Sequence, residues 1–181
     1  ITGRNGLLGP KITLKLRNNA DVQVIATSSG PNRIHDSEGY TYESLDITSK
    51  AEVDAVMAKY TPHVVINTAA MTNVDACESE KEKCRQLNVD AVQYLADACL
   101  KYNTHLVHLS TDFIFDGENG PYKEEDTPNP LSYYGQSKWD AEKILINSKD
   151  LKWAILRTII VYGIVDNMSR SNVVLWAKEA L

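Results

Sequence analysis

Apolar residues recur along this chain in two alternating spacings. Short apolar runs, typical of buried strands, are followed by longer segments in which apolar residues return every three or four positions, as on one face of a helix. The runs predict strands over 21–27, 40–47, 63–67, 104–109 and 153–158. The longer segments predict helices over 7–19, 50–60, 80–102 and 171–181, and a loop and helix within 110–148. This alternation predicts an α/β fold with a mainly parallel sheet.

The remaining segments read as loops. Turn-forming residues fill 28–39, and small residues fill 68–75. Gly, Pro, Asp and Glu crowd together in 116–129, which we interpret as a lid or surface loop rather than a domain linker. The chain opens on Ile1, Thr2 and Gly3, which leaves no room for a strand before the first glycine, and we therefore expect further residues before Ile1.

Composition narrows the class of protein. The 181 residues suffice for one domain with a real core, and 43% hydrophobic with 24% charged residues is ordinary for a soluble protein. A net charge of −5 argues against nucleic acid as a main partner, and no apolar run is long enough to span a bilayer. Three cysteines without metal or disulfide spacing predict free thiols in a reducing cytoplasm.

Three glycines, Gly3, Gly6 and Gly9, precede the first predicted helix. Glycines at such a place let the backbone approach a pyrophosphate, which the positive end of the helix dipole then attracts. The spacing is not the one most common in dehydrogenases, so this motif alone is weak evidence. Its position before a helix in an alternating α/β chain strengthens the prediction of a dinucleotide site.

The end of the strand predicted over 21–27 should face the ribose of such a cofactor. An acidic residue there favours NAD, whereas small or basic residues admit a 2′-phosphate. This chain has Ser28 and Ser29 there, followed by Arg33, and Arg4 lies in the glycine loop. NADP is therefore favoured, with NAD still open, although either arginine is equally readable as a solvated surface charge. Asp46 fits an adenine contact or a helix cap.

A possible catalytic group spans 110–138. Thr111 follows an apolar strand, and Tyr134 and Lys138 stand four positions apart at a predicted helix start, where both side chains share one face. We expect the Lys138 ammonium to lower the pKa of the Tyr134 phenol, which otherwise titrates near 10, and Thr111 to hydrogen-bond a substrate oxygen. Such a set can transfer a proton to or from a carbonyl or alcohol oxygen. An ordinary helix-face pair remains the alternative.

With both motifs placed, the chain resembles the extended short-chain dehydrogenase/reductases, and within them the dTDP-4-dehydrorhamnose reductases. The matching phrases are 2–9, 67–78, 88–91, 110–117, 121–126, 130–138 and 156–158. The resemblance implies a Rossmann-type doubly wound parallel sheet in a nucleotide-binding domain over 1–160. It also implies that 161–181 begins a substrate-binding region, most of which lies outside this chain.

The resemblance further implies an enzyme that reduces the 4-keto group of a dTDP-linked 6-deoxyhexose with NADPH. Its catalytic set would be Thr111, Tyr134 and Lys138. Its cofactor site would comprise Gly3, Arg4, Asn5, Gly6, Leu7, Leu8, Ser28, Arg33, Asp46, Ile47, Ala69, Ala70, Thr72, Ser110, Tyr134 and Lys138. Its sugar-nucleotide site would comprise Thr72, Val74, Asp75, Thr111, Asp112 and Phe113. Phe113 departs from the tyrosine common in that family, and residues 164–171 also differ from the family pattern.

Two alternatives stay open. The regulatory β subunit of methionine adenosyltransferase resembles the same reductases and keeps the Tyr-x-x-x-Lys spacing, yet it acts as a partner protein. An epimerase or dehydratase of the extended family is the third possibility. Dehydratases use an acid pair beside the catalytic hydroxyl, and here only Asp112 is present. A homodimer is compatible with each of these functions.

Overall fold

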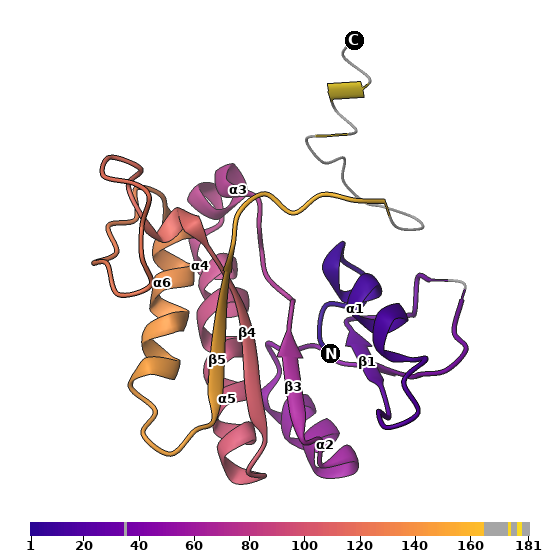
Figure 1. Cartoon of the computed structure of the whole chain (residues 1–181). Coiled ribbons are helices and arrows are strands. Elements are labelled where there is room, and N and C mark those ends of the chain that lie inside the picture. The colour runs from indigo at the N-terminus through magenta and orange to yellow at the C-terminus, as the bar shows by residue number, and fades with distance from the viewer. Residues whose placement is uncertain (35, 165–173, 175–176, 179–181) are drawn as a thin grey trace.

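The structure, a computed structural model, describes residues 1–34, 36–164, 174 and 177–178 (Figure 1). Its strands are β1 (Ile25–Ser28), β2 (Thr41–Ser44), β3 (Val64–Asn67), β4 (His105–Thr111) and β5 (Trp153–Thr158). Each adjacent pair is parallel, with β1 beside β2 and β4 between β3 and β5.

The first two residues join these strands into one layer. Thr2 forms a parallel bridge with Asn67 at the end of β3, and the carbonyl of Ile1 accepts a hydrogen bond of 2.7 Å from the backbone N–H of Thr27 in β1. Residues 1–2 therefore occupy the sheet position between β1 and β3. The spatial order β2, β1, residues 1–2, β3, β4, β5 is that of a doubly wound Rossmann-type sheet.

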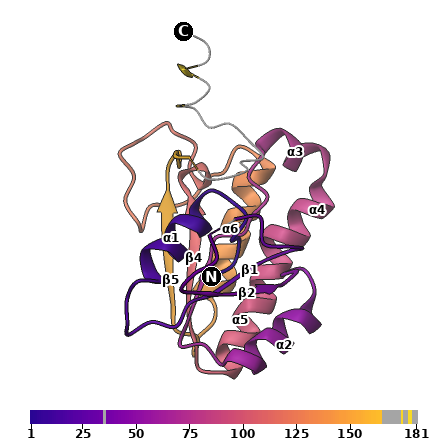
Figure 2. The ribbon, with the colours of Figure 1, turned by 90° about the vertical axis from the view of Figure 1, so that its right-hand side faces the viewer.

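Helices cover the sheet on two sides. They are α1 (Leu8–Leu16), α2 (Lys50–Tyr60), α3 (Val74–Ser79), α4 (Lys81–Arg85), α5 (Ala91–Lys101) and α6 (Tyr133–Ile146), with a π-helical turn at Gln86–Asp90 and a 3-10 turn at Asp112–Ile114. Figure 2 shows α1 on one side of the sheet and α2 and α5 on the other. The core lies under α2, α5 and α6, where Val53, Leu95, Leu106, Ala141 and Leu145 are fully or almost fully buried.

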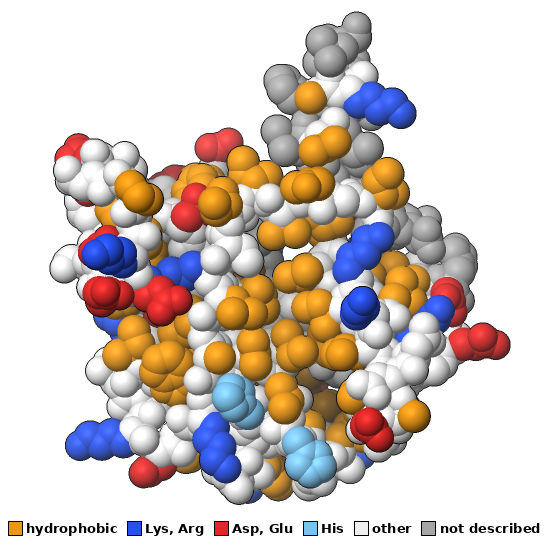
Figure 3. All heavy atoms as spheres, viewed as in Figure 1, with side chains coloured by type: hydrophobic (Ala, Val, Ile, Leu, Met, Phe, Trp, Pro, Cys, Tyr) orange, Lys and Arg blue, Asp and Glu red, His pale blue; other side chains and the backbone are white. Residues whose placement is uncertain are grey.

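On the other side, part of the sheet carries exposed apolar side chains. Val64 of β3 and Leu156 of β5 are each about half exposed. Figure 3 shows hydrophobic side chains gathered over the middle of this face.

The α/β class and the parallel sheet predicted from the sequence are confirmed, and α2 begins and ends where its pattern predicts. Two local predictions are wrong. The segment 68–75 is not loop throughout, because Asn73 accepts a hydrogen bond from the N–H of Ala76 and starts α3. The helix expected over 80–102 is interrupted by the π-turn. The helix expected over 171–181 lies mostly outside the described residues.

The loop predicted over 116–129 is tied to the sheet through Arg157 of β5. The Arg157 guanidinium makes a two-pronged ion pair with Glu142 of α6, with Nη2 to Oε2 at 2.8 Å and Nε to Oε1 at 3.1 Å. It also donates to the Glu124 carbonyl at 2.8 Å and stacks over the Phe115 ring. Because the Glu142 side chain is fully buried, its charge depends on Arg157 for compensation.

We expect Arg157→Leu to lower the free energy of unfolding by about 3 kcal/mol, because it leaves the Glu142 carboxylate buried without its partner. Chemical denaturation measures the loss. The control is Arg85→Leu, since Arg85 pairs with Asp90 on the surface and should cost less than about 1 kcal/mol. The double variant Arg157→Leu with Glu142→Leu should recover most of the loss; equal losses in both arginine variants would contradict this account.

Candidate cofactor and active site

A cleft of about 260 Å³ opens at the carboxyl ends of β1 and β3. In parallel α/β sheets, ligands bind at this edge, because the loops that follow the strands gather there. The predicted residues that line the cleft are Gly3, Asn5, Gly6, Ser28, Arg33, Asp46, Ile47, Ala69 and Ala70. Ser29, which the sequence placed with Ser28 on the ribose side, also lines it. Thr27, Leu45, Thr68 and Leu87 line it too, although they were not among the predicted site residues.

The glycines let the loop after Thr2 fold back tightly. Gly3 has a φ of +72°, and a Cβ atom there would lie 2.7 Å from Thr68 Oγ1 and 2.9 Å from the Ala69 backbone nitrogen. A Cβ atom on Gly9 would lie 2.3 Å from the Gly3 carbonyl oxygen. A Cβ atom on Gly6, by contrast, would lie 3.2 Å from the Gly3 carbonyl oxygen and would meet no other atom within 4 Å. Gly6 therefore borders open space in the cleft.

The start of α1 differs from the starts of α2, α3 and α6. Ser49, Asn73 and Ser132 each cap their helix with a side-chain oxygen, whereas Leu7 at the start of α1 provides no such cap. The first turn of α1 also has no acidic residue. No side chain at the start of α1 therefore caps its free N–H groups or offsets its positive dipole end. These groups could instead bind the pyrophosphate of a dinucleotide.

Asn5 holds the side of the cleft that carries Arg33 in shape. Its Oδ1 accepts from the N–H of Arg33 at 3.0 Å, and its Nδ2 donates to the Pro31 carbonyl at 3.0 Å. The exposed Arg33 side chain is thereby carried on a loop fastened to the glycine turn. Asp46 lines the cleft too, but its carboxylate already accepts from the N–H and hydroxyl of Thr48, which favours its alternative as a local turn residue before α2.

Arg4 does not lie where the sequence suggested. Its side chain is fully buried and does not line the cleft. The guanidinium stacks on the Tyr40 ring at 4.9 Å and donates to the Tyr40 hydroxyl at 2.9 Å. The expectation that Arg4 faces a cofactor phosphate is therefore not met, because the backbone turn at Gly3 directs this side chain toward the loop before β2.

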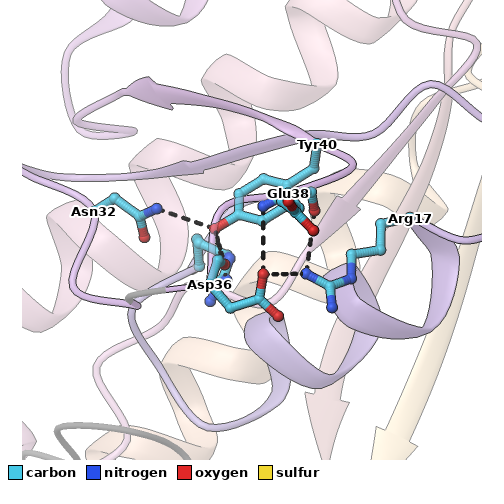
Figure 4. A network of polar contacts seen from close by, with 6 residues as sticks. Arg17, Asn32, Asp36, Glu38 and Tyr40 are labelled. Atoms are coloured by element: carbon cyan, nitrogen blue, oxygen red, sulfur yellow. Dashed lines mark hydrogen bonds and ion pairs between the residues drawn. The ribbon is translucent and has the colours of Figure 1, made fainter.

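A polar network fastens that loop to α1 (Figure 4). The Arg17 guanidinium pairs with Asp36 at 2.6 Å, and the Tyr40 hydroxyl donates to the Asp36 carbonyl at 2.9 Å. Asn32 donates to the same hydroxyl at 3.0 Å. This network supports the side of the cleft that carries Arg33.

Thr111 and Tyr134 lie near each other but are not among the residues that line the cleft. Thr111 ends β4, and its hydroxyl contacts Asp112 and the N–H of Phe113, at 3.1 and 3.2 Å. The Phe113 ring meets the Tyr134 ring edge to face at 5.8 Å, and Phe113 is 45% exposed. Burial raises the pKa of the Tyr134 phenol, an effect that the nearby Thr111 hydroxyl opposes. This direction is opposite to the one expected from the sequence, so the phenol is kept protonated.

Lys138 does not direct its ammonium group at Tyr134 in the way that we expected. Its Nζ donates to the Leu109 carbonyl at 2.7 Å and lies 3.1 Å from Nε2 of His108. Complete burial lowers the pKa of Lys138 to about 8, while the nearby Glu142 and Cys84 oppose this shift. Tyr134 and Lys138 thus share one helix, but the polar contacts of Lys138 are with His108 and Leu109 of β4.

The predicted substrate-side residues lie in and after the loop that follows β3. Thr72 and Asp75 are exposed there, and Val74 is the first residue of α3. Asn88 in the π-turn holds this loop by accepting from the N–H of Met71 at 2.7 Å and donating to the Met71 carbonyl at 3.0 Å. A π-turn often marks a functional position, and here it directs Asn88 at the loop.

Besides Arg4, Thr72, Tyr134 and Lys138, three further predicted cofactor residues lie apart from the cleft. Leu7 and Leu8 form the start of α1, where their backbone rather than their side chains would serve a ligand. Ser110 is buried in β4, and its hydroxyl has no hydrogen-bond partner among the described residues. Sequence reasoning also overlooked buried Asn67, Asn88 and His108, although 67 and 88 begin two of the matching phrases.

A second cavity of about 140 Å³ lies under the amino-terminal half of the sheet. Apolar side chains such as Val24, Val65 and Met57 dominate its lining. It offers no convergent polar groups, so we assign it no chemistry.

Comparison with known proteins agrees with this geometry. Residues 1–179 match the family model described as the RmlD substrate binding domain. A dTDP-4-dehydrorhamnose reductase from Aggregatibacter actinomycetemcomitans is 38% identical over 90% of this chain and 51% of its own length. Methionine adenosyltransferase 2 subunit beta from Bos taurus is 34% identical over 96% of this chain and 49% of its own length.

The fold also matches solved structures. The crystal structure of dTDP-4-dehydrorhamnose reductase from Bacillus anthracis in complex with NADP has a TM-score of 0.74 and 29% identity, over 93% of this chain and 55% of that one. The chain spans about half the length of the curated relatives it matches. Among the described residues, no helix has the length and apolar character needed to cross a membrane. From the match over 1–179, together with these identities, the chain belongs to the RmlD substrate-binding domain family.

Proposed function

We propose that the protein of which this chain forms all or part is a reductase that uses NADPH to reduce the 4-keto group of a dTDP-linked 6-deoxyhexose. The observation that carries the proposal is the placement of Thr111 at the end of β4 and of Tyr134 at the start of α6, at the same edge of the sheet as the glycine-lined cleft. A protonated phenol beside a hydroxyl suits protonation of a carbonyl oxygen. The similarity to dTDP-4-dehydrorhamnose reductases supports the sugar-nucleotide substrate.

In this reaction the bound nicotinamide supplies hydride to the C4 carbon, and the chain's own residues handle the proton. Tyr134 donates its phenolic proton to the C4 oxygen, which yields the alcohol. The raised pKa of Tyr134 keeps that proton in place at neutral pH until charge develops on the oxygen. Thr111 stabilises the same oxygen by hydrogen bonding, and Phe113 presents an exposed apolar ring toward the sugar side.

The residues present fit a nicotinamide dinucleotide. The uncapped start of α1 and the bare Gly6 backbone suit the pyrophosphate. The ribose side carries Ser28, Ser29 and Arg33 and no acid from β1, which suits a 2′-phosphate. The NADP complex of the Bacillus anthracis relative supports the same cofactor.

A second candidate is a partner protein of methionine adenosyltransferase. The observation in its favour is the similarity to that enzyme's subunit beta over 96% of this chain, whereas the Aggregatibacter reductase matches 90% of it. In this case the dinucleotide cleft would serve binding rather than turnover. The two candidates differ in what they require of Tyr134, which only the reductase needs for catalysis.

Tyr134→Phe in the full-length protein should reduce turnover about 100-fold or more, because a positioned proton donor contributes about 10² to 10⁴. Cofactor affinity should stay unchanged. Turnover is measured as NADPH oxidation with a dTDP-4-keto-6-deoxyhexose. Tyr133→Phe, which changes the neighbouring tyrosine in the same helical turn, is the control and should keep full activity. Undiminished turnover in Tyr134→Phe would remove this residue from the mechanism.

Arg33→Ala should weaken NADPH binding about 10-fold and leave NADH binding unchanged, because only NADPH carries the 2′-phosphate that a guanidinium would pair with. Isothermal titration with both cofactors measures the difference. The control is Arg85→Ala, an exposed arginine on α4. An equal loss for both cofactors would show that Arg33 supports the loop rather than reading the phosphate.

Binding to a methionine adenosyltransferase catalytic subunit separates the two candidates. The reductase proposal predicts no complex at micromolar concentrations and turnover that depends on Tyr134. A stable complex by analytical ultracentrifugation, together with no NADPH oxidation for any dTDP-4-keto sugar, would support the second candidate instead.

A further inference from the structure

A row of buried polar side chains crosses the sheet from residue 2 to α6. Thr2 Oγ1 donates to Asn67 Oδ1 at 2.6 Å, Asn67 Nδ2 lies 3.2 Å from His108 Nδ1, and His108 Nε2 lies 3.1 Å from Lys138 Nζ. All four side chains are at most 4% exposed. Water therefore cannot substitute for a missing partner, and the direction of each hydrogen bond can be worked out along the row.

The orientation of the Asn67 amide follows from its neighbours. Its Oδ1 faces two donors, the Thr2 hydroxyl at 2.6 Å and the backbone N–H of Ala69 at 3.3 Å. Turning the amide over would place its NH₂ group against that backbone N–H. The Asn67 NH₂ group therefore faces His108 and donates to Nδ1.

This orientation selects one form of the His108 ring. Because Nδ1 accepts from Asn67, the proton of the neutral imidazole is on Nε2. Burial and the neighbouring Lys138 both lower the pKa of His108 well below its ordinary value, so the doubly protonated ring is disfavoured. The Nε2–H group then points at Lys138 Nζ.

A neutral Lys138 amine satisfies every contact, since it accepts from His108 Nε2–H and donates to the Leu109 carbonyl. A charged ammonium has only donors. It would require the ring to move its proton to Nδ1, where it would oppose the Asn67 NH₂ group at 3.2 Å. The protonation state of Lys138 and the tautomer of His108 are thus linked through Asn67.

We propose that Asn67 and His108 are positioning residues that set the protonation state of Lys138: Asn67 fixes His108 as the Nε2–H tautomer, and His108 favours the neutral amine. The inference deepens the proposed reductase function, on which its catalytic consequence rests. Other titratable groups near Lys138 are Glu142 and Tyr134 on α6 and Cys84 on α4. Glu142, the largest opposing charge, is itself paired with Arg157.

The test uses Asn67→Asp in the full-length protein. An aspartate at 67 keeps the acceptor for Thr2 and Ala69 but presents a second acceptor to His108, which selects the Nδ1–H tautomer. Nε2 then accepts from the Lys138 ammonium. At about pH 9, above the Lys138 pKa of about 8, the native amine is mostly neutral, and we expect nitrogen NMR of the ring to show the Nε2–H tautomer in the native protein and the Nδ1–H tautomer in the variant. The pKa of Lys138, followed by NMR of its side chain, should rise by about one unit.

A second readout is stability against pH. The folded pKa of Lys138, about 8, lies below its ordinary 10.5, so the unfolded chain binds the extra proton between these values. The Lys138 contribution to the free energy of unfolding therefore increases as the pH rises from about 8 to 10.5. Asn67→Asp should reduce this increase, whereas a change that only weakened packing would lower stability by the same amount at every pH.

Asn73→Asp is the matched control, because it makes the same chemical change at a helix cap where aspartate serves equally well. It should alter neither the His108 tautomer nor the Lys138 pKa. The pH profile of NADPH oxidation should shift upward by about one unit in Asn67→Asp alone.

The Nδ1–H tautomer in the native protein at about pH 9, or an unchanged Lys138 pKa in a folded Asn67→Asp variant, would overturn the inference. If Asn67→Asp does not fold, the His108 tautomer of the native protein still tests the inference. The measurements on the His108 ring and on Lys138 need no substrate, so they test this inference independently of the reductase proposal. If only the reductase proposal is wrong, the expected tautomers will be observed but no turnover will be measured.

Discussion

Every strand of this sheet runs in the same direction, and that constraint determines where the chemistry can be. Parallel strands leave all their carboxyl ends at one edge, so the loops after residue 2, β1, β3 and β4 emerge side by side. The glycine turn, Ser28 and Ser29, and Thr111 are distant in sequence but share this edge. Changes in loop length elsewhere leave this convergence intact, whereas a change in the pairing of residues 1–2 with β3 would separate the turn from Thr111 and Tyr134.

The second constraint is a row of buried, hydrogen-bonded polar side chains inside the sheet. A buried row from Thr2 to Lys138 replaces apolar packing across three strand positions and one helix, and each member is satisfied only if its neighbours keep their orientation. A buried row with an unpaired polar group destabilises the fold, whereas a fully hydrogen-bonded row favours one arrangement of the core. The row connects Thr2, which precedes the glycine turn, with α6, the helix that carries Tyr134. The same buried hydrogen bonds therefore fix the position of the glycine turn relative to Tyr134.

Sequence patterns were sufficient for the parts of the molecule that depend on periodicity. The apolar runs predicted the parallel sheet, and the apolar spacing over 50–60 predicted the bounds of α2. Patterns failed where a tertiary contact decides the outcome. Whether Arg4 faces a phosphate or Tyr40 depends on the turn at Gly3, and whether Lys138 approaches Tyr134 or His108 depends on a strand thirty residues away. The spacing of two residues on one helix shows that they share a face, but it does not show what lies opposite that face.

The uncapped start of α1 has a consequence beyond catalysis. A helix that leaves its first N–H groups without a side-chain cap forgoes about 1 kcal/mol of its own stability. A bound dinucleotide would restore that interaction, and any ligand that binds only the folded state raises the free energy of unfolding with the logarithm of its concentration. On the function proposed here, the lifetime of the folded protein in a cell would depend on the concentration of its cofactor. A shortage of the nucleotide would then lower both the amount of folded enzyme and its turnover.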